Sequence, residues 1–132
     1  MKLLSFQCAL LAALTVFSAG WLHAQDAALQ QDAQVIESLR KNGSDFSKLH
    51  LVDYFFVLPA ESNARSIAAE LGAAGYSVKG VGAVPQNNSW EVHVQKSQLI
   101  QVDSMQATTR RLAALAQKFG GYYDGWGAPV AK

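Results

Sequence analysis

The stretch FGGYYDGWG, residues 119–127, carries the clearest signal for the fold of the C-terminal part of the chain. Its glycines are interleaved with large aromatic residues, and Asp124-Gly125 is a strong turn pair. Glycine loses more backbone freedom on folding than any other residue, so this density indicates tight turns or close backbone approach. Each large aromatic side chain can bury roughly 150–250 Å². The stretch therefore predicts either a helix cap followed by a last core strand, or a binding surface formed by Tyr122, Tyr123 and Trp126.

In the sequence before this stretch, the hydrophobic periodicity alternates between helical and extended patterns. It predicts helices over 26–41, 60–74 and 103–119, and strands over 49–58, 76–84, 90–96 and 122–124. We expect Asp103 or Ser104 to cap the last helix. The order is that of the ferredoxin-like α+β sandwich, β-α-β-β-α-β, with an added N-terminal helix and with the other helices on one face of an antiparallel sheet.

The two faces of the predicted sheet differ in polarity on the third strand but not on the first. Side chains alternate along a strand. In the third strand this alternation separates an apolar set from a polar set: Trp90, Val92 and Val94 against Glu91, His93 and Gln95. The first strand is largely apolar on both sides, which is unusual for a strand exposed on one face. We therefore expect the aromatic tail, the N-terminal helix or a second subunit to cover the second face, which would otherwise mark a partner site.

A set of short motifs follows in order along residues 36–130. It comprises Gly43-x-Asp45, His50-x-Val52-Asp53-Tyr54-Phe55-Phe56, Pro59, Gly75-Tyr76-x-Val78, Trp90-Glu91-Val92, the helical segment 112–119 and the closing FGGYYDGWG. This ordered set resembles the ribonuclease E inhibitor family, also called regulator of ribonuclease E activity B (RraB). The resemblance implies a small, non-catalytic α+β domain. The family's named member binds the endonuclease ribonuclease E and restrains RNA decay in the bacterial cytoplasm.

The first 24 residues have the pattern of a cleavable secretory signal peptide. Met1-Lys2 gives a positive start, residues 3–19 are strongly apolar, and Ala24 precedes the polar sequence that begins at Gln25. The sequence thus predicts a signal peptide over 1–24, a single domain over 25–132, and a periplasmic or secreted location.

Two alternatives to this start remain open. Cleavage can fall after Ala19 or Gly20, and an uncleaved segment 3–22 is long enough to anchor the protein in the inner membrane. Export in either form places the domain away from ribonuclease E, so its true partner need not be that enzyme.

Charge and cysteine content exclude two classes of function. Of the 11 basic residues, Lys2 lies in the signal peptide, so 10 remain against 10 acidic residues. Nucleic-acid binding rests on clustered Lys and Arg, so this neutral domain is expected to bind a protein and no nucleic acid. Cys8 is the only cysteine and also lies in the signal peptide, which excludes a disulfide or a thiol nucleophile in the exported domain.

The remaining titratable residues form no recognisable catalytic motif. Glu91 and His93 share a strand face, and a His beside a carboxylate such as Asp53 or Asp124 can act as a general base. Neither a nucleophile motif nor a phosphate-binding glycine loop accompanies them in the sequence. A catalytic zinc needs at least three protein ligands, which His50, His93 and Asp53 supply only if the fold brings them together. We expect no enzyme activity, no metal and no cofactor.

The sequence therefore predicts a non-catalytic protein-interaction domain. Its candidate binding residues are Tyr122, Tyr123, Asp124, Trp126, Asp53, Phe55, Trp90 and Glu91. The alternative is an exported small-ligand-binding protein or enzyme that uses a cleft near His93, Glu91 and Trp126. A concave pocket with converging polar groups would distinguish this alternative from a flat interaction surface.

Overall fold

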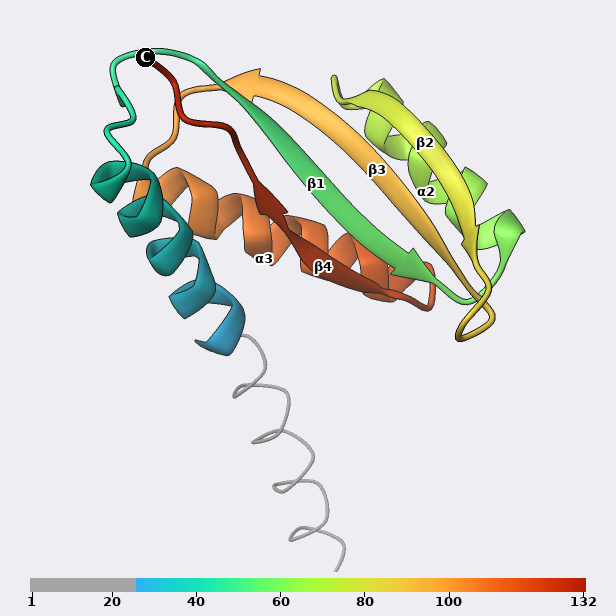
Figure 1. The fold of residues 1–132 in the computed structure, drawn as a ribbon. Helices are drawn as coiled ribbons and strands as arrows, with labels where there is room; N and C mark the ends of the chain where they lie inside the picture. The colour runs from blue at the N-terminus through green and yellow to red at the C-terminus, as the bar shows by residue number, and fades with distance from the viewer. Residues whose placement is uncertain (1–25) are drawn as a thin grey trace, which may run out of the picture.

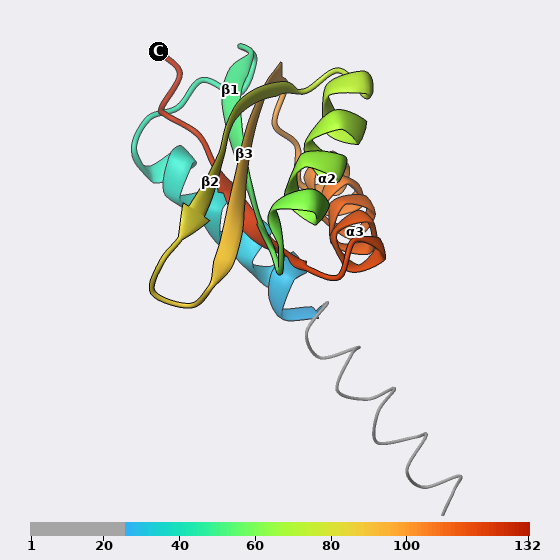
Figure 2. The same cartoon turned by 90° about the vertical axis from the view of Figure 1, so that its right-hand side faces the viewer.

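A computed structural model describes residues 26–132, so the predicted signal peptide lies outside the described residues. A helix over residues 26–41 comes first. The remaining elements are β1 (His50–Leu58), α2 (Glu61–Ala73), β2 (Ser77–Val84), β3 (Ser89–Gln98), α3 (Val102–Lys118) and β4 (Tyr122–Gly127). They form two layers, with α2 and α3 packed on one face of a twisted four-stranded sheet (Figure 1; Figure 2). Within this part of the chain, no helix is long and apolar enough to cross a membrane.

The sheet has the strand order β2-β3-β1-β4, and each strand is antiparallel to its neighbours. In this order β3 and β1 occupy the centre of the sheet. The chain passes from β1 through α2 to β2, and from β3 through α3 to β4. This is the ferredoxin-like arrangement, and the predicted fold class is confirmed. Two details were wrong: β4 extends to Gly127, and α3 begins after Gln101 without a side-chain cap, so neither Asp103 nor Ser104 caps it.

The core is built on the strict alternation of β1. Every second side chain from the first to the last residue of β1 is buried beneath the helices: His50, Val52, Tyr54, Phe56 and Leu58. Val92 and Val94 of β3 lie beside them, with Leu71 of α2 and Leu112 of α3 above. Burying an apolar side chain of this size contributes about 1.5–3 kcal/mol, so this face holds the domain together.

The glycine-rich end has a distinct local reason for each of two glycines. Gly120 ends α3 in the left-handed region, with φ of 79°, a conformation that glycine adopts without strain. Gly121 then crosses β1 so closely that a Cβ would lie 2.1 Å from the carbonyl oxygen of Val57. The crossing brings β4 to the edge of the sheet with Trp126 turned into the core. Of the two sequence interpretations of this stretch, the structure shows the core strand.

The second face of the sheet is not covered by the described residues. The indole of Trp126 is buried on the helix side, and the chain end instead meets the 44–48 loop, where Ala131 accepts a hydrogen bond from the Asp45 amide. The N-terminal helix packs beside α3 and β4, with a hydrogen bond from Gln106 to the carbonyl of Leu29. The expectation that the tail or this helix covers the second face was therefore wrong.

Candidate interaction surface

The uncovered sheet face, called the open face below, carries both apolar and polar side chains. Strand alternation and register place the following residues on it: Leu51, Asp53, Phe55, Val57, Glu91, His93, Gln95 and Tyr122. Leu51 is 46% exposed and Tyr122 is 55% exposed, whereas Phe55 and Val57 are half-buried. The face therefore presents accessible apolar groups around a central polar cluster.

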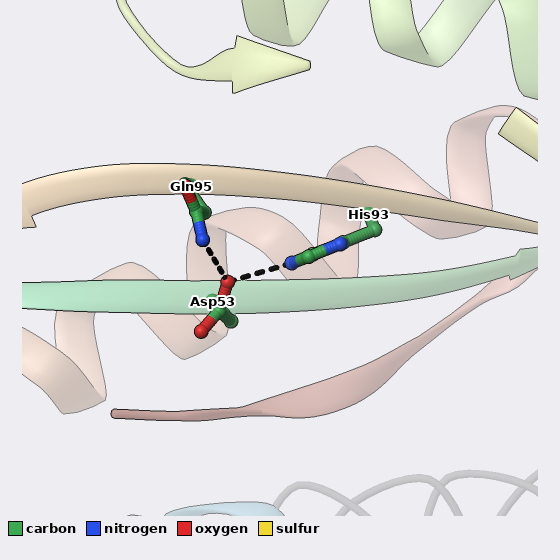
Figure 3. A network of polar contacts seen from close by, with 3 residues as sticks. All are labelled: Asp53, His93 and Gln95. Carbon is green, nitrogen blue, oxygen red and sulfur yellow. Dashed lines mark hydrogen bonds and ion pairs between the residues drawn. The ribbon is translucent and has the colours of Figure 1, made fainter. Parts of the chain in front are cut away.

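The centre of the open face is a stacked pair fixed by hydrogen bonds. The rings of Phe55 and His93 lie 4.7 Å apart and are within 13° of parallel. His93 Nε2 lies 2.6 Å from Asp53 Oδ1, and the same oxygen accepts a hydrogen bond from the Gln95 amide at 2.7 Å (Figure 3). One carboxylate oxygen thus holds two side chains of β3 in a defined orientation.

Glycines flank this stacked pair on both edges of the sheet. The register aligns Gly80, His93, Phe55 and Gly125 in one row across all four strands. No described atom lies within 4 Å of where a Cβ would stand on Gly80 or Gly125. In this row the stacked rings are therefore flanked by two positions that carry no side chain. Glycine in a strand often marks a place where another backbone approaches closely.

A shallow hollow of about 350 Å³ lies over β2 and the adjoining side of β3. It is lined by residues 80–86 of β2 and the following turn, together with Glu91 and His93 of β3. Trp126 is not part of it, because that indole is buried on the opposite face of the sheet. The predicted cleft of His93, Glu91 and Trp126 was therefore wrong, because Trp126 lies on the opposite face of the sheet from Glu91 and His93.

The candidate binding residues divide between the two faces. Asp53, Phe55, Glu91 and Tyr122 meet on the open face, and Asp124 is exposed at the β4 edge. The other three point into the helix side, as shown by their register against buried β1 residues: Tyr123 opposite Phe56, Trp126 opposite Tyr54, and Trp90 opposite Leu58. A bulge between Phe55 and Phe56 in the β1–β4 pairing shifts the register within β4, so Tyr123 and Trp126, three positions apart, lie on the same face.

The possible metal ligands are not brought together. His50 is buried on the core side of β1, where Ser44 Oγ lies 2.6 Å from its Nε2, whereas Asp53 points to the open face. The part of the chain that the structure describes contains no group of three side chains able to hold a metal ion.

The sequence interpretation missed a buried polar cluster on the helix side of β4. Trp126 Nε1 donates a hydrogen bond to Asp32 Oδ1 at 2.8 Å, although Asp32 is only 2% exposed. Burial raises the pKa of the Asp32 carboxyl above its ordinary value, although the neighbouring Thr109 hydroxyl and the Trp126 N–H oppose the shift. The available signal was spacing: Asp32 lies three and four residues from Leu29 and Ile36 on the apolar stripe of its helix, where a charge is unexpected.

Fold and surface define a class: a ferredoxin-like domain with one helix-covered face and one open face that carries a preorganised polar and aromatic cluster. Comparison with known proteins gives the family. The sequence model described as "Regulator of ribonuclease activity B" matches residues 29–128, which is most of the chain. The chain belongs to the regulator of ribonuclease activity B family, and the resemblance seen in the sequence motifs is confirmed.

Three curated relatives bear the name regulator of ribonuclease activity B. The protein of Actinobacillus succinogenes is 27% identical over 109 residues, covering 80% of this chain and 77% of its own. The protein of Xenorhabdus nematophila is 26% identical over 108 residues, with the same coverage. The protein of Pseudoalteromonas atlantica is 28% identical over 97 residues, covering 71% of this chain and 83% of its own. These names describe regulators of an enzyme.

Proposed function

We propose that this chain is an exported, non-catalytic domain that acts by binding a protein partner through its open face. The observation that carries the proposal is the exposure of apolar side chains around a fixed polar cluster. Leu51 and Tyr122 reach solvent on either side of the hydrogen-bonded Asp53 and His93. Interface cores are built from aromatic and apolar side chains that lose water on binding, and preorganised partners lose less entropy.

The family membership supports regulation by contact. Relatives are named as regulators of ribonuclease activity, so the partner proposed by family precedent is a ribonuclease. With 10 basic and 10 acidic residues after Lys2, the domain lacks the positive surplus that phosphate binding uses. Any effect on RNA would then pass through the bound enzyme and not through RNA itself.

Affinity capture from the native host, with identification of the captured proteins by mass spectrometry, tests this function. The double variant Leu51→Ser/Tyr122→Ser removes two exposed apolar groups from the open face and should reduce partner recovery by about tenfold or more, as loss of a central contact does. Both residues are exposed, so stability should change by no more than about 0.5 kcal/mol per site.

The matched control is Val78→Ser/Val102→Ser. These two side chains are 44% and 40% exposed but lie off the open face, at the β2 edge and at the start of α3. The control should recover the partner as the wild type does. Equal loss with both double variants would contradict a specific role for the open face.

Export makes a separate prediction about the N-terminus. Because residues 3–19 are apolar and polar sequence follows at once, we expect the protein isolated from its host to begin near Gln25. N-terminal sequencing of the periplasmic and membrane fractions checks this. A chain with its N-terminal segment intact in the membrane would indicate an anchor. Intact Met1 in the cytoplasm would refute export and make ribonuclease E the leading partner.

A further inference from the structure

The stacked row across the open face stops at β2. The rings of Phe55 and His93 lie 4.7 Å apart and nearly parallel, which matches the spacing of about 4.7–4.9 Å between neighbouring strands. The next residue of the row is Gly80. It has no side chain, and no described atom lies within 4 Å of where its Cβ would stand. One face of the His93 ring is therefore covered by Phe55, and the other faces the empty place above Gly80.

The hollow of about 350 Å³ over β2 includes this empty place. Gly80 and Gly82 line it together with Glu91 and His93. The register sets Gly80 opposite His93 and Gly82 opposite Glu91, so Glu91 is a diagonal neighbour of the empty place. Diagonal neighbours on one sheet face lie about 7–8 Å apart, within reach of long side chains. A single group in the hollow can thus contact the ring of His93 and the carboxylate of Glu91 together.

The charges around the hollow favour a cation. The carboxylates of Asp53 and Glu91 lie on the open face, and Glu91 is exposed and forms no ion pair with another described residue. No lysine or arginine of the described residues lines the hollow. The nearest basic residue along β2 is Lys79, at the bulge of that strand, and it lies outside the lining.

Resting on the proposed function of the open face, we propose that the hollow binds an arginine side chain of the protein partner. A guanidinium is planar and always charged, stacks on aromatic rings, and forms paired hydrogen bonds with a carboxylate. It would lie above Gly80 as the third plane of the stack and pair with Glu91. A lysine ammonium can pair with Glu91 but is not planar and does not continue the stack. The contact segment of the partner is therefore basic, which complements the two carboxylates of the open face.

Titration of the purified protein with Nα-acetyl-arginine methylamide, followed by NMR, tests the site. The amides of Gly80 and Glu91 and the ring protons of His93 should shift in a saturable way. Nα-acetyl-citrulline methylamide, which has a similar shape without the charge, should produce no saturable shift. The lysine analogue should bind about two- to fivefold more weakly, as expected for the loss of an exposed stacking contact.

Three results of this titration would overturn the proposal. Absence of saturation with the arginine probe would refute the site. Equal shifts with the citrulline probe would refute the role of the charge, and equal affinities for the arginine and lysine probes would refute the stacking.

Gly80→Leu fills the empty place and leaves every charge unchanged. The φ of Gly80 is not positive and its Cβ would meet no described atom within 4 Å, so the variant should fold, and it should bind the arginine probe about tenfold or more weakly. Gly127→Leu is the matched control, because its Cβ position in β4 is equally open and lies outside the hollow. Unchanged binding by a folded Gly80→Leu would overturn the assignment. If circular dichroism shows that it does not fold, Glu91→Gln replaces it with the same expectation.

Partner capture from the native host separates this inference from the function on which it rests. Glu91→Gln keeps the size of the side chain and removes its charge, and it should lower partner recovery by about tenfold or more. Asp103→Asn, which changes an exposed carboxylate in the first turn of α3, is the matched control and should recover the partner as the wild type does. If Leu51→Ser/Tyr122→Ser loses the partner and Glu91→Gln keeps it, the open face remains the partner surface and the arginine site is refuted. If neither loses the partner, both proposals are refuted.

Discussion

Replacing Trp126 by alanine is expected to lower the free energy of unfolding by about 3–5 kcal/mol, as large aromatic truncations in cores do. The indole is 8% exposed, lies opposite Tyr54 in the β1–β4 pairing and donates its N–H to Asp32. The variant removes a large apolar group and also removes the hydrogen-bond donor to Asp32 Oδ1. Urea denaturation followed by circular dichroism measures the change.

Tyr122→Ala provides the control in the same strand. Tyr122 is 55% exposed on the open face, so its loss should change stability by no more than about 0.5 kcal/mol. Trp126→Phe, which keeps an apolar ring and loses the hydrogen bond, should fall between the two. If Trp126→Ala is as stable as Tyr122→Ala, then Trp126 is not a core residue and the position of β4 is wrong.

Gly121→Ala is expected to destabilise the domain by about 3 kcal/mol or more, at the upper end of the range for overpacking. The added Cβ would lie 2.1 Å from the Val57 carbonyl oxygen and 3.1 Å from Leu58 Cα, both backbone atoms of β1. Since neither atom can rotate away, β4 must move from the sheet. Thermal and urea denaturation should both show the loss.

Gly127→Ala is the matched control, because Gly127 also lies in β4 at its other end. No described atom lies within 4 Å of the position of its Cβ, so alanine should be neutral or stabilise by up to about 1 kcal/mol through the unfolded chain. Comparable losses for Gly121→Ala and Gly127→Ala would show that general backbone flexibility, and not the crossing at Val57, explains the effect.

Local pattern was enough to predict the fold, because each element carries its own signal. The Val-, Tyr- and Phe-rich run over 49–58 predicted a strand where β1 lies, and Gly43 and Gly75 adopt positive φ near the predicted helix ends. The N-cap of α3 was missed because Gln101 adopts the extended capping conformation without a side-chain hydrogen bond. Competing polar residues next to it gave the stronger sequence signal.

The open face was harder to predict, because its side chains shield one another. Phe55 is half-buried by stacking on His93, which the hydrogen bond to Asp53 holds in place. Apolar residues on both sides of β1 therefore do not require a third layer, although their sequence pattern favoured one. The approach of Asp53 to His93 depends on the register of β1 against β3. The spacing of residues along either strand does not predict that register.

The buried cluster at Asp32, on the helix side of the sheet, could not be predicted from spacing along the chain either. Asp32 is separated by 94 positions from Trp126, whose N–H it accepts. Within the N-terminal helix it is only a charged residue on an apolar stripe. Its partners come from α3 and β4, so tertiary packing alone creates the cluster.

Site-specific photo-crosslinking in the native host tests the central claim, that the open face is the partner surface, most directly. A photoreactive residue at position 51 replaces an exposed leucine of the open face, and one at position 102 replaces an exposed valine at the start of α3. We expect a covalent adduct with a protein partner from position 51 and none from position 102. An adduct from position 102 alone, or equal adducts from both positions, would contradict the assignment of the open face.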